Sequence, residues 1–74
     1  MRYADVILPV PLHATFTYAI PEGMGVVEGV RVLVPFGRGS KYVGLVCRVH
    51  DQQPQDYAVK DIEAVMDVPG DGTS

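Results

Sequence analysis

The chain has 74 residues, of which 47% are hydrophobic and 20% are charged, and its formal net charge is −3. A chain of this length forms one small domain and buries only about 60% of the surface that it exposes when unfolded. No apolar run approaches the roughly 20 residues of a membrane-spanning helix, and the residues after Met1 do not form the apolar core of a signal peptide. The single cysteine, Cys47, excludes an internal disulfide and fits a reducing compartment, so we expect the cytoplasm.

Hydrophobic residues recur with a period of two along most of the chain, which is typical of β-strands. In chain order, this pattern predicts strands over residues 3–10, 16–20, 30–36, 42–50 and 62–68. The residues expected to face the core are Ala4, Val6, Leu8 and Val10, then Phe16, Tyr18 and Ile20, then Val30, Val32, Val34 and Phe36, then Val43, Leu45, Cys47 and Val49, and finally Ile62, Ala64, Met66 and Val68.

The short predicted strands and the glycine-containing turns between them indicate an all-β fold. We expect a small barrel or a rolled antiparallel sheet of five to six short strands, because rolling up hides the edges of a valine-rich sheet. Residues 1–68 are predicted to form this domain. Residues 69–74 are small and polar, and we expect them to be a flexible tail at a truncation point.

Charge is unevenly distributed along the chain. Residues 1–50 contain five Lys or Arg and three Asp or Glu, whereas residues 51–74 contain one lysine and six Asp or Glu. The first two thirds are therefore mildly basic, which is compatible with local phosphate contacts but not with a large electrostatic footprint.

Two groups of residues are candidates for binding. Phe16 and Tyr18 could each stack on a nucleic-acid base, although their shared strand face favours core packing for at least one of them. Gly37 and Arg38 lie in a predicted hairpin turn, followed by Lys41. The glycine permits close approach of the backbone and the two cations could contact phosphate. The alternative is an ordinary turn with solvated charges, and the residues alone leave both open.

Catalytic and metal-binding signals are weak. His13 and His50 lack further ligands at metal spacing, and we expect both at the surface. Cys47 and His50 are three residues apart in a predicted strand, so they should point to opposite faces, which argues against a nucleophile–base pair. We expect Cys47 to pack as a small hydrophobic residue.

Four segments, in this order and spacing, resemble the N-terminal DNA-binding domain of the primosomal protein N′ (PriA) helicase family. They are residues 6–12 (VILPVPL), 15–21 (TFTYAIP), 29–38 (GVRVLVPFGR) and 43–46 (VGLV). The resemblance covers roughly residues 4–68. It implies a compact, non-enzymatic β-domain that captures the 3′ end of the nascent leading strand at a stalled replication fork.

The resemblance also implies site residues. In the family, the terminal nucleotide occupies a pocket formed by the F-x-Y strand, the glycine of the P-F-G turn and a residue of the last strand, which correspond here to Phe16, Thr17, Tyr18, Gly37 and Glu63. Thr17 stands where the best-known members have an aspartate, and Glu63 stands where members often have a lysine. The predicted DNA-binding residues, including the two cations of the turn, are Phe16, Thr17, Tyr18, Gly37, Arg38, Lys41 and Glu63.

The function expected from the resemblance is to target a replication-restart helicase to single-stranded or forked DNA with a free 3′ end. The parent protein would be an ATP-dependent 3′–5′ helicase, with ATP, magnesium and zinc bound outside this fragment and other primosome proteins as further partners. The alternative is a small β-domain that docks onto another protein without DNA-end specificity. An independent enzyme, such as a cysteine hydrolase, finds no supporting constellation in the sequence.

Overall fold

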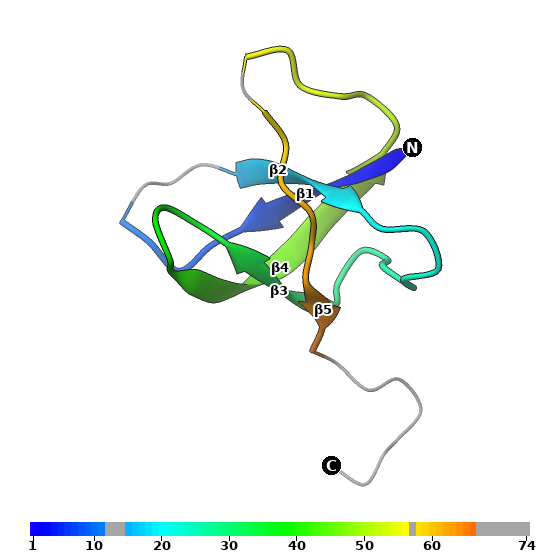
Figure 1. Cartoon of the computed structure of the whole chain (residues 1–74). Helices are drawn as coiled ribbons and strands as arrows, with labels where there is room; N and C mark the ends of the chain where they lie inside the picture. Colours follow the sequence, from blue (N-terminus) through cyan, green and yellow to red (C-terminus); the bar gives the residue numbers. More distant parts are fainter. Residues whose placement is uncertain (12–14, 57, 67–74) are drawn as a thin grey trace, which may run out of the picture.

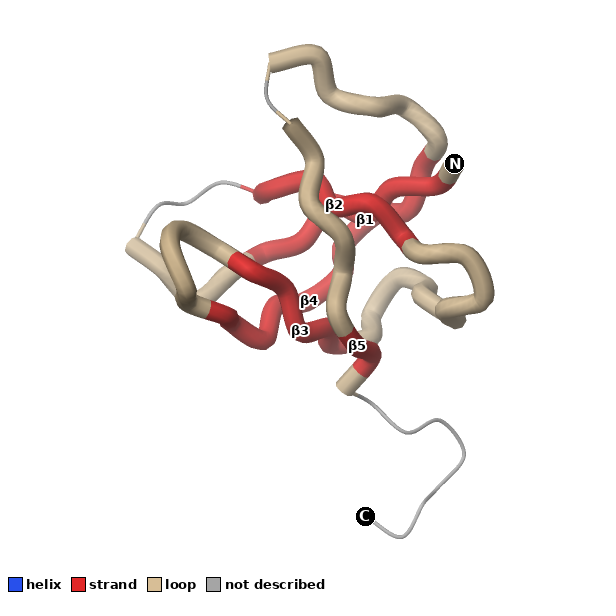
Figure 2. The backbone as a smooth tube through the Cα atoms, viewed as in Figure 1, coloured by secondary structure: helices blue, strands red, loops and turns tan. Residues whose placement is uncertain are grey.

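The computed structural model describes residues 1–11, 15–56 and 58–66, which fold into one rolled antiparallel sheet (Figures 1 and 2). The strands are β1 (Arg2–Ile7), β2 (Thr15–Ile20), β3 (Arg31–Pro35), β4 (Lys41–His50) and β5 (Ala64–Val65), in the spatial order β2-β1-β4-β3-β5. These described residues contain no helix, and hence none that could span a membrane. The all-β prediction is confirmed, as a rolled sheet that does not close into a barrel.

One segment connects the two edges of the sheet. Residues 58–63, here called the crossing segment, run from beside β2 to β5 (Figure 1, yellow to orange). The Ala19 amide donates to the Lys60 carbonyl at 2.9 Å, and the Ile62 amide donates to the Ala19 carbonyl at 3.0 Å. The Glu63 amide then donates to Leu33 of β3 at 2.8 Å. The backbone of this segment therefore partly covers the edges of both β2 and β3.

The core lies inside the roll and contains the predicted faces of the first three strands. Its fully or nearly fully buried side chains are Ala4, Val6, Leu8, Tyr18, Ile20, Val26, Val32, Val34, Val46 and Ile62. Val10, Phe16, Val30 and Phe36 are half-buried and pack against this cluster. The predicted core faces of β1, β2 and β3 are thus correct, although Tyr3 and Ala19 on the opposite faces are buried as well.

The predicted core face of β4 is wrong for three of its four residues, whereas Val49 packs against the core as predicted. Val43, Leu45 and Cys47 are exposed, whereas Gly44 and Val46 are buried. Both faces of this strand are apolar, so alternation could not identify the inner one. Gly44 identifies it in the structure, because a Cβ there would lie only 2.7 Å from the Ile7 carbonyl oxygen and from Leu8 Cδ2.

The end of β4 contains an irregularity that also changes which side chains meet. Asp5 pairs with Arg48 but its neighbour Val6 pairs with Val46, so Cys47 is an extra residue on β4, as in a β-bulge. The bulge interrupts the regular strand before His50, and the expectation that Cys47 and His50 point to opposite faces stays a prediction. The expectation that Cys47 packs in the core is wrong, because its side chain is exposed.

The fifth strand is shorter than predicted. Ile62 is buried as expected, but Val65, rather than Met66, packs against the core, and Met66 is exposed. Val68 and the predicted tail at residues 69–74 lie outside the described residues. The alternation fails because residues 60–62 contact β2, whereas residues 63–66 contact β3.

Candidate DNA-end cleft

A small cleft of about 190 Å³ lies where β2, the β3–β4 turn and the crossing segment meet. Four of the seven predicted site residues line it: Phe16, Thr17, Tyr18 and Gly37. The remaining lining residues are Pro35, Phe36, Ala58 and Lys60. The volume is below the roughly 300 Å³ at which small-molecule pockets begin, so the cleft suits one end of a larger partner.

Aromatic rings form one wall of the cleft. The Phe16 and Phe36 rings pack edge to face with their centroids 4.9 Å apart, and Phe36 packs in the same way on Tyr42 at 5.8 Å. Such pairs fix ring orientation as well as burying area. Phe16 is only half-buried, so part of this fixed ring remains accessible.

Tyr18 plays a different part from Phe16. Its side chain is buried in the core, and its hydroxyl donates to the Pro35 carbonyl at 2.8 Å. This bond links β2 to the end of β3 across the inside of the roll. The expectation that at least one of the two aromatic residues packs in the core therefore holds for Tyr18.

The β3–β4 turn forms a second wall. The Phe36 amide donates to the Ser40 carbonyl at 2.9 Å, and Gly37 and Gly39 have φ angles of +74° and +72°. These left-handed conformations favour glycine. A Cβ at Gly37 would meet no protein atom within 4 Å. Gly37 thus satisfies both readings of the sequence, because the turn requires a glycine and the same residue lines the cleft.

One charged residue lines the cleft and three predicted ones lie outside its lining. Lys60 lines the cleft, whereas Arg38, Lys41 and Glu63 are not among its lining residues. Arg38 is exposed on the turn, and the Lys41 ammonium pairs with the Glu63 carboxylate at 2.9 Å. Lys60 is not among the predicted site residues, because its position depends on the pairing of the crossing segment with β2, which the local pattern does not reveal.

A larger hollow of about 470 Å³ lies elsewhere, around the start of β1 and the turn after β2. Arg2 and Glu22 are its charged lining residues, together with Met1, Ile20, Pro21, Gly23 and Met24. Among these described residues there is no aromatic ring on which a base could stack. The smaller cleft is therefore the better candidate for nucleic acid.

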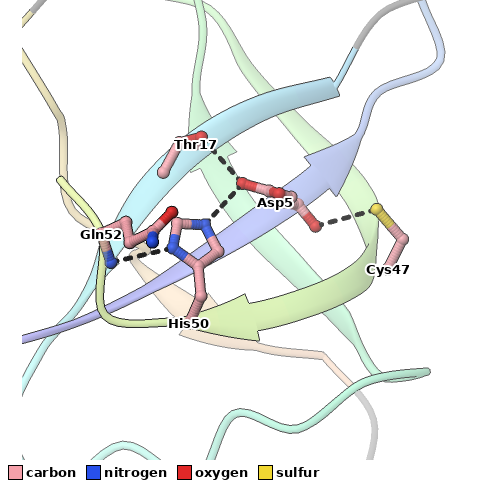
Figure 3. A network of polar contacts seen from close by, with 5 residues as sticks. All are labelled: Asp5, Thr17, Cys47, His50 and Gln52. Atoms are coloured by element: carbon pink, nitrogen blue, oxygen red, sulfur yellow. Dashed lines mark hydrogen bonds and ion pairs between the residues drawn. The ribbon is translucent and has the colours of Figure 1, made fainter. Parts of the chain in front are cut away.

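A polar network lies next to Thr17, where β1 meets β2 and β4 (Figure 3). One oxygen of Asp5, Oδ1, accepts from the Thr17 hydroxyl at 2.8 Å and contacts His50 Nε2 at 2.9 Å. The Gln52 amide donates to His50 Nδ1 at 3.1 Å, and the Cys47 thiol donates to the Asp5 carbonyl at 3.3 Å. Asp5, on β1, thus connects residues of β2 and β4.

The network has consequences for charge and burial. Partial burial opposes ionisation of Asp5, but the hydrogen bonds from His50 and Thr17, aided by the nearby Arg48, hold the pKa of Asp5 below its ordinary value.

His50 is mostly buried, with 13% of its side chain exposed, so the surface expectation is wrong for this residue. His13 lies outside the described residues. Within the described part of the chain, no group of three His, Cys, Asp or Glu side chains could hold a metal ion.

Comparison with known proteins identifies a family and a similar protein. Residues 5–70 match the family described as the 3′ DNA-binding domain of PriA. The chain is also similar to the replication restart protein PriA of Buchnera aphidicola subsp. Acyrthosiphon pisum (strain APS), with 38% identity over 68 residues. That match covers 90% of this chain but only 9% of the relative. The resemblance read from the sequence is confirmed.

Proposed function

Because this chain belongs to the family of PriA 3′ DNA-binding domains, we propose that it recognises the 3′ end of a nascent strand. Membership of this family makes it a DNA-binding module of the replication-restart type. In this proposal it directs a replication-restart helicase to stalled forks in the cytoplasm. The observation that carries the proposal is the meeting of Phe16, Thr17, Tyr18 and Gly37 at one cleft. These residues come from β2 and a distant turn, and the resemblance had assigned them together.

The cleft offers a distinct contact for each part of a terminal nucleotide. The accessible part of the Phe16 ring stacks on the base, a contact that contributes about 1–3 kcal/mol. Tyr18, held by Pro35, forms a rigid wall. The Lys60 ammonium contacts a phosphate, and the Thr17 hydroxyl bonds the ribose end. Gly37 allows the DNA backbone to approach the turn, because its missing side chain leaves that space open.

The cations of the turn act outside the cleft. Arg38 is exposed and contacts a phosphate farther along the strand. Lys41 is partly neutralised by its ion pair with Glu63, so its contribution is smaller, and Glu63 acts by holding Lys41 beside the turn. With so few cations, we expect binding in the micromolar range or weaker, with the salt dependence of a small number of phosphate contacts.

Fluorescence anisotropy tests the proposal. Labelled single strands with a free 3′-hydroxyl should bind more tightly than the same sequence ending in a 3′-phosphate, which adds bulk and negative charge at the end. Phe16→Ala should weaken binding about tenfold or more, because the base loses its stacking partner, whereas the control Val27→Ala, at an exposed position outside the cleft, should not. Equal affinities for both ends would contradict end recognition.

A protein-docking role is the second candidate, and one feature favours it. Ile7, Val43 and Leu45 are exposed on the outer face of the sheet, and Ile7 and Leu45 are cross-strand neighbours. A docking domain would show no end-dependent anisotropy signal. The chain spans 9% of the relative that it matches. We therefore also propose, rather than observe, that a parent protein has helicase activity, binds ATP, magnesium and zinc, and contacts other primosome proteins.

A further inference from the structure

Asp5 connects the polar network to the candidate cleft. It faces Thr17 directly across the β1–β2 pair, and Thr17 lines the cleft. The Thr17 hydroxyl carries one proton, and it donates that proton to Asp5 Oδ1 at 2.8 Å. With its proton given to Asp5, the hydroxyl oxygen can act toward a further partner only as an acceptor.

His50 supports this arrangement from the other side of Asp5. Because the Gln52 amide donates to Nδ1, that nitrogen is the acceptor of the ring and Nε2 carries the proton. Nε2 therefore donates to the same Oδ1 that accepts from Thr17, at 2.9 Å. The Tyr3 ring stacks on His50 with centroids 6.2 Å apart, which helps to hold the imidazole in place.

We propose that Asp5, oriented by His50, is a positioning residue that makes Thr17 an obligate hydrogen-bond acceptor and so selects DNA ends that present a 3′-hydroxyl donor. This inference rests on the proposed function of the cleft and adds the device that sets its end preference. A threonine hydroxyl in isolation can donate or accept, and so discriminates poorly between a donor and an acceptor. A carboxylate that fixes its proton removes that ambiguity.

The test compares two oligonucleotides of one sequence, ending in a 3′-hydroxyl or in a 2′,3′-dideoxy sugar, on the 74-residue chain. The ratio of their dissociation constants isolates the terminal hydroxyl, because neither end adds charge. One hydrogen bond corresponds to a ratio of about five. We expect Thr17→Val to reduce the ratio to about one. Asp5→Ala should reduce the ratio less, because the released threonine hydroxyl can still bond the 3′-hydroxyl but no longer has a fixed orientation, and the double variant should match Thr17→Val.

Asp5→Asn separates orientation from charge. The amide oxygen can still accept from Thr17 and His50, so this variant should keep most of the ratio although its charge is gone. Glu28→Ala removes an exposed carboxylate outside the network and should leave the ratio unchanged. Because each ratio is measured on one protein, partial unfolding of a variant affects both dissociation constants equally.

The outcomes distinguish the inference from the proposed function. If the unsubstituted chain binds both ends equally, recognition of the terminal hydroxyl fails and the inference fails with it. If the chain prefers the 3′-hydroxyl but Asp5→Ala keeps that preference, the role of Asp5 is refuted and the cleft stands. A loss in Asp5→Asn as large as that in Asp5→Ala would assign the effect to charge and also refute the orienting role.

Discussion

Gly44 is the residue at which a single methyl group should be most damaging. A Cβ there would clash with Val6 Cγ1 and lie 2.7 Å from both the Ile7 carbonyl oxygen and Leu8 Cδ2. The oxygen belongs to the β1 backbone, which pairs with β4 and cannot rotate away. Overpacking of this kind costs about 1–3 kcal/mol. Because part of the obstacle is backbone, we expect Gly44→Ala to lower the free energy of unfolding by about 3 kcal/mol through overpacking. Alanine also makes the unfolded chain less flexible, which offsets up to about 1 kcal/mol of this loss.

The net loss of about 2 kcal/mol should lower Tm by about 8–16 °C in a domain of this size. Thermal unfolding followed by far-ultraviolet circular dichroism measures it. Gly25→Ala is the matched control, because a Cβ there meets nothing within 4 Å and Gly25 does not have a positive φ. This control should leave Tm unchanged or slightly raised. A Tm within about 3 °C of the original in Gly44→Ala would refute the packing of β1 against β4 described above.

Two further predictions concern charge. The pKa of Asp5 in the folded chain lies below its ordinary value of 3.8, so its ionised form contributes stability that is fully present above that pH and is lost as the pH falls through the lowered pKa. Unfolding scans between pH 5 and pH 2 should therefore show a steeper loss of stability in the original chain than in Asp5→Asn, and parallel curves would contradict this. Replacing Arg38 and Lys41 together with alanine should weaken DNA binding, and the salt slope should fall by about 0.7 for every phosphate of a single strand that is no longer neutralised. Circular dichroism should show an unchanged fold, and unchanged affinity would place the phosphate-binding cations elsewhere.

The fold could be predicted from the sequence where one strand face is clearly more apolar than the other. In β3, Val32 and Val34 alternate with the exposed Arg31 and the half-buried Leu33, and the inner face follows directly. In β4 both faces are apolar, so the prediction chose the wrong one. Gly44 was the available signal, because a glycine inside a strand often marks a close approach of another backbone.

The candidate site was predicted where its residues lie in recognisable segments, and missed where it depends on long-range pairing. Phe16 and Gly37 belong to segments that the family resemblance identified, and the structure brings them together. Lys60 reaches the cleft because its carbonyl bonds to Ala19 of β2, a pairing that no local pattern encodes. The network around Asp5 depends equally on long-range pairing, because β1 must pair with both β2 and β4 before Asp5 meets Thr17 and His50.

The crossing segment determines when the cleft comes into existence during folding. The hairpins β1–β2 and β3–β4 pair residues that are near in sequence, whereas residues 60–62 must find Ala19 across the whole of β3 and β4. Closing such a long loop costs entropy that local hairpins do not incur, so we expect this pairing to form late. The wall that holds Lys60 is then the last to be added, and a partly folded chain has the aromatic wall without the cation. A partner that touches the aromatic wall, the β3–β4 turn and the Lys60 side of the cleft therefore binds only the completed fold and stabilises it by mass action.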